Sequence, residues 1–272
     1  MTNSYDEAVD LLYQATTDDG ILASTTEQAN YRRIWCRDGV VCGLAGLLTG
    51  EGRLVDGLEQ TLRTLADHQG PDGQIPSNVR VVDGEVTDVS YGGVCGRVDT
   101  LGWFVIGVLQ HAKLTGREGV ADELEPAMER ALELFSTWEF NGRGLVYVPQ
   151  GGDWADEYVL RGYILYVQLL RLWALRLYAD WADDDRRADE ARALQQRLER
   201  NYWPTEEADP EEVYHRWAFE RYVEEHGEPT HWLAALAPSG YFPQFDGWSN
   251  ALSVLLGLGA EEQQEAVLDY GQ

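Results

Sequence analysis

The fold is decided by one long amphipathic run near the middle of the chain, Glu157–Tyr178, which reads EYVLRGYILYVQLLRLWALRLY. Its apolar residues recur every three or four positions, as on one face of a helix. They form a stripe of Tyr163, Val167, Leu170, Ala174 and Leu177, widened by Tyr166, Leu169 and Trp173. An apolar face this wide must be covered on more than one side, so we expect a helix inside an assembly of helices.

Nine further segments have helical periodicity and are separated by glycine-rich turns, whereas strict alternation of apolar and polar residues is scarce. We expect these helices at about Tyr5–Ala15, Gly39–Leu48, Leu54–His68, Thr100–Leu114, Val120–Trp138, Arg187–Asn201, Pro210–Arg221, Ser249–Leu256 and Ala260–Tyr270. Short extended pieces are expected at Val79–Val89, where Asp83-Gly84 signals a hairpin turn, and at Leu145–Val148. The pattern predicts an all-α chain, a toroid of helix pairs forming a single domain over residues 1–272.

The chain is strongly acidic. Its 272 residues are 44% hydrophobic, which is enough for a sizeable core, but 47 acidic against 21 basic residues give a net charge of −26. Lys113 is the only lysine. This charge repels phosphate backbones and anionic lipid, so we expect no nucleic-acid and no membrane partner. Acid spread along the chain with almost no lysine is typical of a halophile's protein surface, which molar salt screens; an ordinary acidic mesophilic enzyme is the alternative.

The N-terminus and the cysteines indicate the cellular location and the redox environment of the chain. Met1–Asp10 contains no basic segment followed by an apolar run, and no stretch approaches the length of a membrane span, so we expect a cytoplasmic protein. Cys36, Cys42 and Cys95 lack metal-ligand spacing and are odd in number. We therefore expect buried thiols, no disulfide framework and no metal site.

Five loops between the expected helices are rich in Trp, Asp, Arg, Gly and Gln. These are residues 35–38, 69–78, 98–100, 151–157 and 245–250. A pyranose ring has apolar faces that stack on indole, and its hydroxyl groups need fixed carboxylate, amide and guanidinium partners. Any one such loop is more often a structural ion pair at a helix start. Five in one chain favour a carbohydrate-binding cleft.

The sharpest of these loops is Gly151–Glu157, which places Asp153, Asp156 and Glu157 around Trp154. One interpretation is helix capping, with Asp153 or Asp156 as the N-cap of the following helix. The other is catalytic: burial of one carboxyl group against the indole and a neighbouring carboxylate makes it a general acid for a glycosidic oxygen. An inverting hydrolase then needs a second carboxylate that activates water on the other face of the sugar.

Taken together, several motifs resemble the (α/α)6-barrel glycosidases, a group that includes glucoamylases, alkaline/neutral invertases, trehalases and the glucosidase part of glycogen-debranching enzymes. The resemblance covers most of the chain in order and spacing. The motifs are Ile34-Trp35-Cys36-Arg37-Asp38, Asp72-Gly73-Gln74-Ile75-Pro76-Ser77, Val98-Asp99-Thr100-Leu101-Gly102-Trp103, Gly152-Asp153-Trp154-Ala155-Asp156-Glu157 with Gly162-Tyr163 and Val167-Gln168, and Phe245-Asp246-Gly247-Trp248-Ser249-Asn250.

This resemblance implies roles for particular residues. It implies that Trp35, Arg37 and Asp38 line the subsite of the non-reducing sugar, with Asp99 and Trp103 at the same barrel mouth.

The Asp-Trp-x-Asp-Glu loop resembles the one that carries the general acid. Asp156 is the first candidate by its distance before Val167-Gln168, and Asp153 is the second because trehalase-like relatives place the acid in a Gly-Trp-Asp-Phe setting. Trp154, Glu157, Asp246 and Asn250 are the remaining expected substrate contacts. Water is the nucleophile, and no metal or organic cofactor is required.

The sequence departs from the group at its end. There the general base follows a His-Asn-Gly-x-x-Trp-Pro-like segment, which does not follow Asn250, and the chain stops at Gln272 after the tenth of an expected twelve helices. We expect an incomplete barrel without its base, either from a truncated gene or with an apolar seam covered by self-association or a second chain.

The primary hypothesis is an inverting glycoside hydrolase acting on a glucosidic bond in an oligosaccharide or glycogen-like substrate. A non-catalytic sugar-binding or interaction protein is the first alternative. A sugar epimerase or lyase on the same toroid is the second, and it calls for histidines in the mouth loops, of which these five loops contain none.

Overall fold

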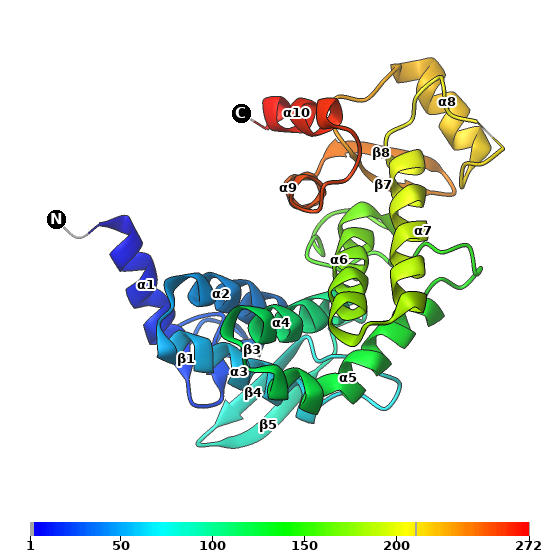
Figure 1. Cartoon of the computed structure of the whole chain (residues 1–272). Coiled ribbons are helices and arrows are strands. Elements are labelled where there is room, and N and C mark those ends of the chain that lie inside the picture. Colours follow the sequence, from blue (N-terminus) through cyan, green and yellow to red (C-terminus); the bar gives the residue numbers. More distant parts are fainter. Residues whose placement is uncertain (1–2, 210, 272) are drawn as a thin grey trace. The chain divides into compact units, whose positions relative to one another are not determined.

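The computed structural model describes residues 3–209 and 211–271, and the chain divides into two compact units, Met1–Leu134 and Phe135–Gln272 (Figure 1). Ten α-helices occur among these residues, one for each expected segment, which confirms a helix-rich fold. They are α1 Ser4–Ala15, α2 Cys36–Thr49, α3 Gly52–Asp67, α4 Asp99–Thr115, α5 Glu118–Thr137, α6 Leu165–Ala182, α7 Asp185–Tyr202, α8 Arg216–His226, α9 Gly247–Leu255 and α10 Glu261–Tyr270. The toroid and the single domain stay predictions.

In the first unit, α2, α3 and α4 pack against one another. The stripe Leu54, Leu58, Leu62 and Leu65 of α3 is buried, as its helical spacing predicts. Close approach of α2 to α3 depends on Gly43, since a Cβ atom there would lie 2.5 Å from Leu58 Cδ1. The helix α4 is apolar on nearly every side and buried along most of its length, so it forms the centre of this unit.

Two small antiparallel sheets complete the first unit. One pairs β1 Thr16–Thr17 with β2 Gly20–Ile21, and the other has the order β3 Ile34–Trp35, β4 Asn78–Val82 and β5 Glu85–Ser90. The β4–β5 turn has positive φ at both Asp83 (53°) and Gly84 (79°). This left-handed pair is what the Asp-Gly signal predicts for a tight hairpin, so the expected hairpin is confirmed.

The second unit combines the paired helices α6 and α7 with a sheet that was not predicted. Its order is β6 Tyr163–Ile164, β7 Leu233–Ala237 and β8 Gly240–Phe245, all antiparallel, and α9 packs against α6. Every residue of β7 is buried. The Leu and Ala of β7 have helical propensity and no alternation, which is why periodicity does not reveal the strand. With three small sheets, the chain is helix-rich rather than all-α.

Several boundaries differ from the expected ones. The helix expected to begin at Glu157 begins at Leu165, because Tyr163 and Ile164 pair with Leu236 and Ala235 of β7. The helix expected at Pro210–Arg221 runs from Arg216 to His226, and Pro210 lies outside the described residues.

The extended piece expected at Leu145–Val148 is reduced to one β-bridge, between Val148 and Gly162.

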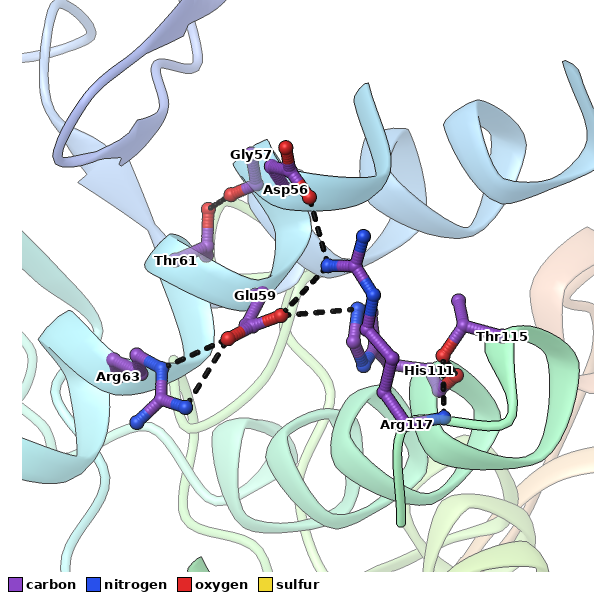
Figure 2. Close-up of polar contacts among 8 residues, drawn as sticks. All are labelled: Asp56, Gly57, Glu59, Thr61, Arg63, His111, Thr115 and Arg117. Atoms are coloured by element: carbon purple, nitrogen blue, oxygen red, sulfur yellow. Dashed lines mark hydrogen bonds and ion pairs between the residues drawn. The ribbon is translucent and has the colours of Figure 1, made fainter. Parts of the chain in front are cut away.

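A polar network ties α3 to α4 around a buried histidine (Figure 2). The guanidinium of Arg117 donates to Asp56 Oδ1 at 2.7 Å and to Glu59 Oε2 at 3.0 Å, and Arg63 donates to Glu59 Oε1 at 3.1 Å. The His111 ring is fully buried, with Nε2 3.8 Å from Glu59 Oε2. Burial lowers the pKa of His111, and the nearby Glu59 carboxylate opposes this only in part.

Across residues 3–209 and 211–271, no helix has the length and apolarity needed to cross a membrane.

Candidate functional site

A short ion pair organises the predicted sugar-binding residues of the first unit. Arg37 lies in the first turn of α2 and Asp99 is the first residue of α4. Arg37 Nη1 donates to Asp99 Oδ2 at 2.6 Å, and the Asp99 side chain is fully buried while that of Arg37 is 24% exposed. A carboxylate this deep requires such a partner, because an isolated buried charge is strongly unfavourable.

A partly exposed aromatic surface is formed by Tyr31 and Trp35, and Trp35 lies two residues before Arg37 in the chain. The rings of Tyr31 and Trp35 stack with centroids 5.8 Å apart, and Trp35 Nε1 donates to the Asn30 carbonyl at 3.1 Å. Asp38, also in the first turn of α2, is half-buried at a helix start, where the dipole favours a carboxylate. A partly exposed indole suits stacking on a sugar ring.

Several residues of this unit differ from expectation in how far they are buried. Trp103 is 2% exposed in the second turn of α4, and this burial is typical of core packing, so its sugar contact stays a prediction that burial does not favour. Among the thiols, Cys36 is buried and burial raises its pKa well above the usual value. The expectation of buried thiols is wrong for Cys42 and Cys95, which are half-buried.

In the second unit, the Gly151–Glu157 loop does not cap a helix. Capping is wrong because α6 starts only at Leu165, with Ile164 as its N-cap residue. Asp153 is 2% exposed, and its Oδ1 accepts from the backbone N–H of Ala155 at 3.0 Å, which closes a tight turn within the loop. Asp156 and Glu157 are exposed, and Trp154 is half-buried between them and Asp153 in sequence.

The loop forms one wall of a pocket of about 460 Å³. The opposite walls come from β7, from β8 and from the start of α9. The lining residues are Trp154, Ala155, Tyr158, Val159, Leu160, Ala234, Phe242, Gln244, Phe245, Asp246 and Gly247. The structure therefore brings two predicted residues together here, Trp154 and Asp246.

Asp246 is the N-cap of α9 as well as a pocket residue. Its carboxylate accepts from the backbone N–H groups of Trp248 at 3.2 Å and Ser249 at 3.3 Å, and from the Ser249 hydroxyl. Burial raises the pKa of Asp246, and these hydrogen bonds oppose the increase.

Asn250 is buried and hydrogen-bonded to the backbone of neighbouring segments. It is fully buried, its Oδ1 accepts from Trp232 N at 2.9 Å, and its Nδ2 donates to the carbonyls of Trp232 at 3.2 Å and Asp246 at 3.0 Å. These bonds fix the β7 end to α9. The predicted substrate contact of Asn250 stays a prediction.

The predicted site residues are thus divided between the two units. Trp35, Arg37, Asp38, Asp99 and Trp103 belong to the first, and Asp153, Trp154, Asp156, Glu157, Asp246 and Asn250 to the second. Tyr31 and the pocket residues Tyr158 and Phe242 were missed. Tyr31 lies four residues before Trp35, and this spacing was a weak indication that Tyr31 belongs to the same surface. Phe242 lies in the β7–β8 hairpin, which the periodicity of the sequence does not reveal.

No cluster of three or more His, Cys, Asp and Glu residues that could hold a metal ion occurs in the described part of the chain.

Neither a protein-family model nor a curated protein matches the sequence. Solved structures do match the fold. A rhamnosidase from Klebsiella oxytoca with rhamnose bound is similar with a TM-score of 0.66 and 16% identity, over 99% of this chain and 47% of that chain. A GH78 family rhamnosidase of Bacillus sp. GL1 has a TM-score of 0.65 and 14% identity, over 99% of this chain and 26% of that chain. A wild-type glycosidase has a TM-score of 0.55 and 16% identity, over 97% of this chain and 66% of that chain.

At these identities the likeness concerns the fold alone. The chain has a fold found in glycoside hydrolases, and it spans about half of the first rhamnosidase and about a quarter of the second. The expected resemblance to this broad group is confirmed, and the glucoamylase-like subgroup stays a prediction.

Proposed function

We propose that this chain is a glycoside hydrolase domain in which Asp156 is the general acid. One observation carries the proposal: the exposed carboxyl group of Asp156 lies two residues from Trp154, in a loop that walls an aromatic pocket. In the reaction, Asp156 gives its proton to the leaving glycosidic oxygen as the C1–O bond breaks. Water attacks C1 from the opposite face and loses a proton to a second carboxylate, which gives inversion.

Accessibility supports Asp156 over Asp153. A general acid must come within hydrogen-bond distance of the leaving oxygen, about 3 Å. Asp153 is 2% exposed and its Oδ1 already accepts from Ala155 N, so it suits the role of holding the loop. Asp156 is exposed in the same loop and open to a substrate.

In the first unit, considered by itself, Tyr31, Trp35 and Arg37 suit a sugar ring. The stacked pair offers an aromatic face, and the guanidinium of Arg37, fixed by Asp99, offers donors to hydroxyl groups. A glucosidic bond is the substrate proposed from the sequence. Because the similar structures include rhamnosidases, rhamnosides belong in the same substrate panel.

A sugar-binding domain without turnover is the second candidate. It is favoured by the aromatic surface of Tyr31 and Trp35, because stacking of a sugar ring on this surface needs no general base.

Substrates with different leaving groups distinguish the hydrolase from the binding domain, and Asp156 from Asp153 as the general acid. Methyl and 4-nitrophenyl rhamnosides and glucosides, with maltooligosaccharides, are assayed in molar KCl for the natural chain, Asp156→Asn and Asp153→Asn. Asp122→Asn is the matched control, since Asp122 is exposed on α5. We expect Asp156→Asn to lower kcat/KM about a thousandfold for methyl glycosides and far less for 4-nitrophenyl glycosides, whose leaving group needs little protonation.

Equal losses for both leaving groups would contradict Asp156 as the acid. Sugar binding in the natural chain without turnover of any substrate would support the binding domain instead.

A further inference from the structure

The pocket beside the Asp153–Glu157 loop has walls of unusual composition for a sugar subsite. Trp154 comes from the loop and Tyr158 directly follows it, with ring centroids 6.3 Å apart and planes tilted by 57°. Phe242 and Phe245 come from β8. Tyr158 is 64% exposed, so a large part of this aromatic surface is open to a ligand. Aromatic rings pack on one another in offset or tilted arrangements with centroids about 4.5–7 Å apart, so these walls suit a planar ring.

The pocket has few polar side chains, and its one carboxylate is already hydrogen-bonded. Among its lining residues, the side-chain polar groups are those of Gln244 and Asp246, the Tyr158 hydroxyl and the Trp154 indole N–H. Asp246 already accepts three hydrogen bonds, from Trp248 N, Ser249 N and Ser249 Oγ. A pyranose requires several free donors and acceptors for its hydroxyl groups, whereas an apolar ring requires none.

The volume of the pocket and the charge of the chain restrict the kind of ligand further. The volume of about 460 Å³ lies in the range of small-molecule sites, about 300–1,000 Å³, and exceeds what a single phenyl ring fills. The one carboxylate among the lining residues and the net charge of −26 disfavour an anionic ligand. A neutral aromatic group of one or two rings fits both constraints.

We propose that this pocket binds the aromatic aglycone of an aryl glycoside. The pocket residue Ala155 directly precedes Asp156, so an aglycone held here would have its glycosidic oxygen close to the loop's exposed carboxyl group. For the sugar end of the ligand, the inference rests on the proposed function. Its test therefore measures ring binding separately from turnover.

Thioglycosides provide that separation because they resist hydrolysis and remove differences in leaving-group ability. Titration calorimetry in molar KCl compares phenyl with methyl 1-thio-rhamnosides and the corresponding thioglucosides. We expect the phenyl compound of the recognised sugar to bind about tenfold more tightly than the methyl compound, since burial of a phenyl ring stabilises the complex. The ratio should fall to about one or two in Phe242→Ala and in Tyr158→Ala.

Trp217→Ala is the matched control, because Trp217 is an aromatic residue of the same unit, 52% exposed on α8 and not part of the pocket. It should keep the tenfold ratio. Thermal unfolding of each variant shows whether it remains folded, and Phe242→Leu, which retains an apolar side chain, tests the ring contact if Phe242→Ala unfolds.

The outcomes are distinct. Equal affinity for phenyl and methyl thioglycosides, or a ratio that persists in both pocket variants, would overturn the aglycone site even if glycosides are hydrolysed. A tenfold ratio that the pocket variants abolish supports the site, and if no glycoside is hydrolysed, the proposed hydrolase function fails while the ring site stands.

Discussion

Arg37 Nη1 lies 2.6 Å from Asp99 Oδ2, and this contact joins the first turn of α2 to the first turn of α4. The Asp99 side chain is fully buried, so the guanidinium is an internal counterion for a carboxylate shielded from water.

Arg37→Met should therefore destabilise the chain. We expect the free energy of unfolding, measured with urea in molar KCl, to fall by about 3 kcal/mol, because the buried Asp99 carboxylate loses the guanidinium paired with it. Adding Asp99→Asn should restore part of that loss. The control Arg32→Met removes an exposed pair with Glu27, at 2.8 Å, and should cost less than about 1 kcal/mol. A similar small effect at Arg37 would contradict the structural role of the pair.

His111 should make stability depend on pH. Its pKa is lowered by burial in the folded chain, so between the folded pKa and the unfolded value of about 6.5 the unfolded chain binds more protons. Stability from this group is thus fully present above about pH 6.5 and declines as the pH falls through that window. The groups facing the ring, Glu59, Asp56, Arg63 and Arg117, stay in place in His111→Gln.

The measurement is the difference in free energy of unfolding between the natural chain and His111→Gln from pH 8 to pH 5. We expect the natural chain to lose more stability on acidification than the variant. His226→Gln, at an exposed position at the end of α8, is the control. Parallel pH profiles for the natural chain and His111→Gln would rule out this contribution.

Salt should stabilise the chain. Because the net charge is −26 and the charge is spread over the surface, raising KCl from 0.1 M to 1 M shortens the screening length from about 10 Å to about 3 Å and weakens the repulsion. We expect the Tm to rise steadily with KCl. Glu206 and Glu207 are exposed, and the double variant Glu206→Gln/Glu207→Gln should reduce the slope of Tm against KCl concentration. A Tm independent of KCl would contradict the salt-adapted interpretation of the composition.

Asn250→Leu should unfold the second unit more easily without a specific effect on sugar binding. The variant removes the side-chain bonds to the N–H and C=O groups of Trp232 and to the Asp246 carbonyl. The Asp246 carbonyl still accepts from the backbone N–H of residue 250 at 3.0 Å, so the loss falls on the two backbone groups of Trp232. We expect a loss of about 2–4 kcal/mol in the free energy of unfolding. Unchanged stability together with weaker sugar affinity would show that Asn250 contacts the substrate as first predicted.

The sequence predicted each of the ten helices because each has apolar residues at helical spacing, as in Leu54, Leu58, Leu62 and Leu65 of α3. It also predicted the β4–β5 hairpin, because an Asp-Gly pair accepts positive φ with little strain. These are local preferences, expressed within about ten residues of sequence.

The third sheet and the pocket could not be predicted in this way. β7 has the composition of a helix and is a strand because Tyr163 and Ile164, about 70 residues earlier, pair with Ala235 and Leu236. Because Tyr163 and Ile164 belong to this sheet, α6 starts at Leu165, and the Gly151–Glu157 loop precedes the sheet and contributes Trp154 and Ala155 to the pocket.

The sequence by itself determined the helix-rich character of the chain, its acidic surface and the residues that resemble a glycosidase site, since these follow from composition, periodicity and motif. Only the tertiary structure decided that Asp153 is buried while Asp156 is exposed, that Asn250 bonds to the backbone, and that Phe242 faces the same pocket as Trp154. The physical reason is that burial and hydrogen-bond partners come from segments far apart in the sequence, and no local pattern specifies which of them meet.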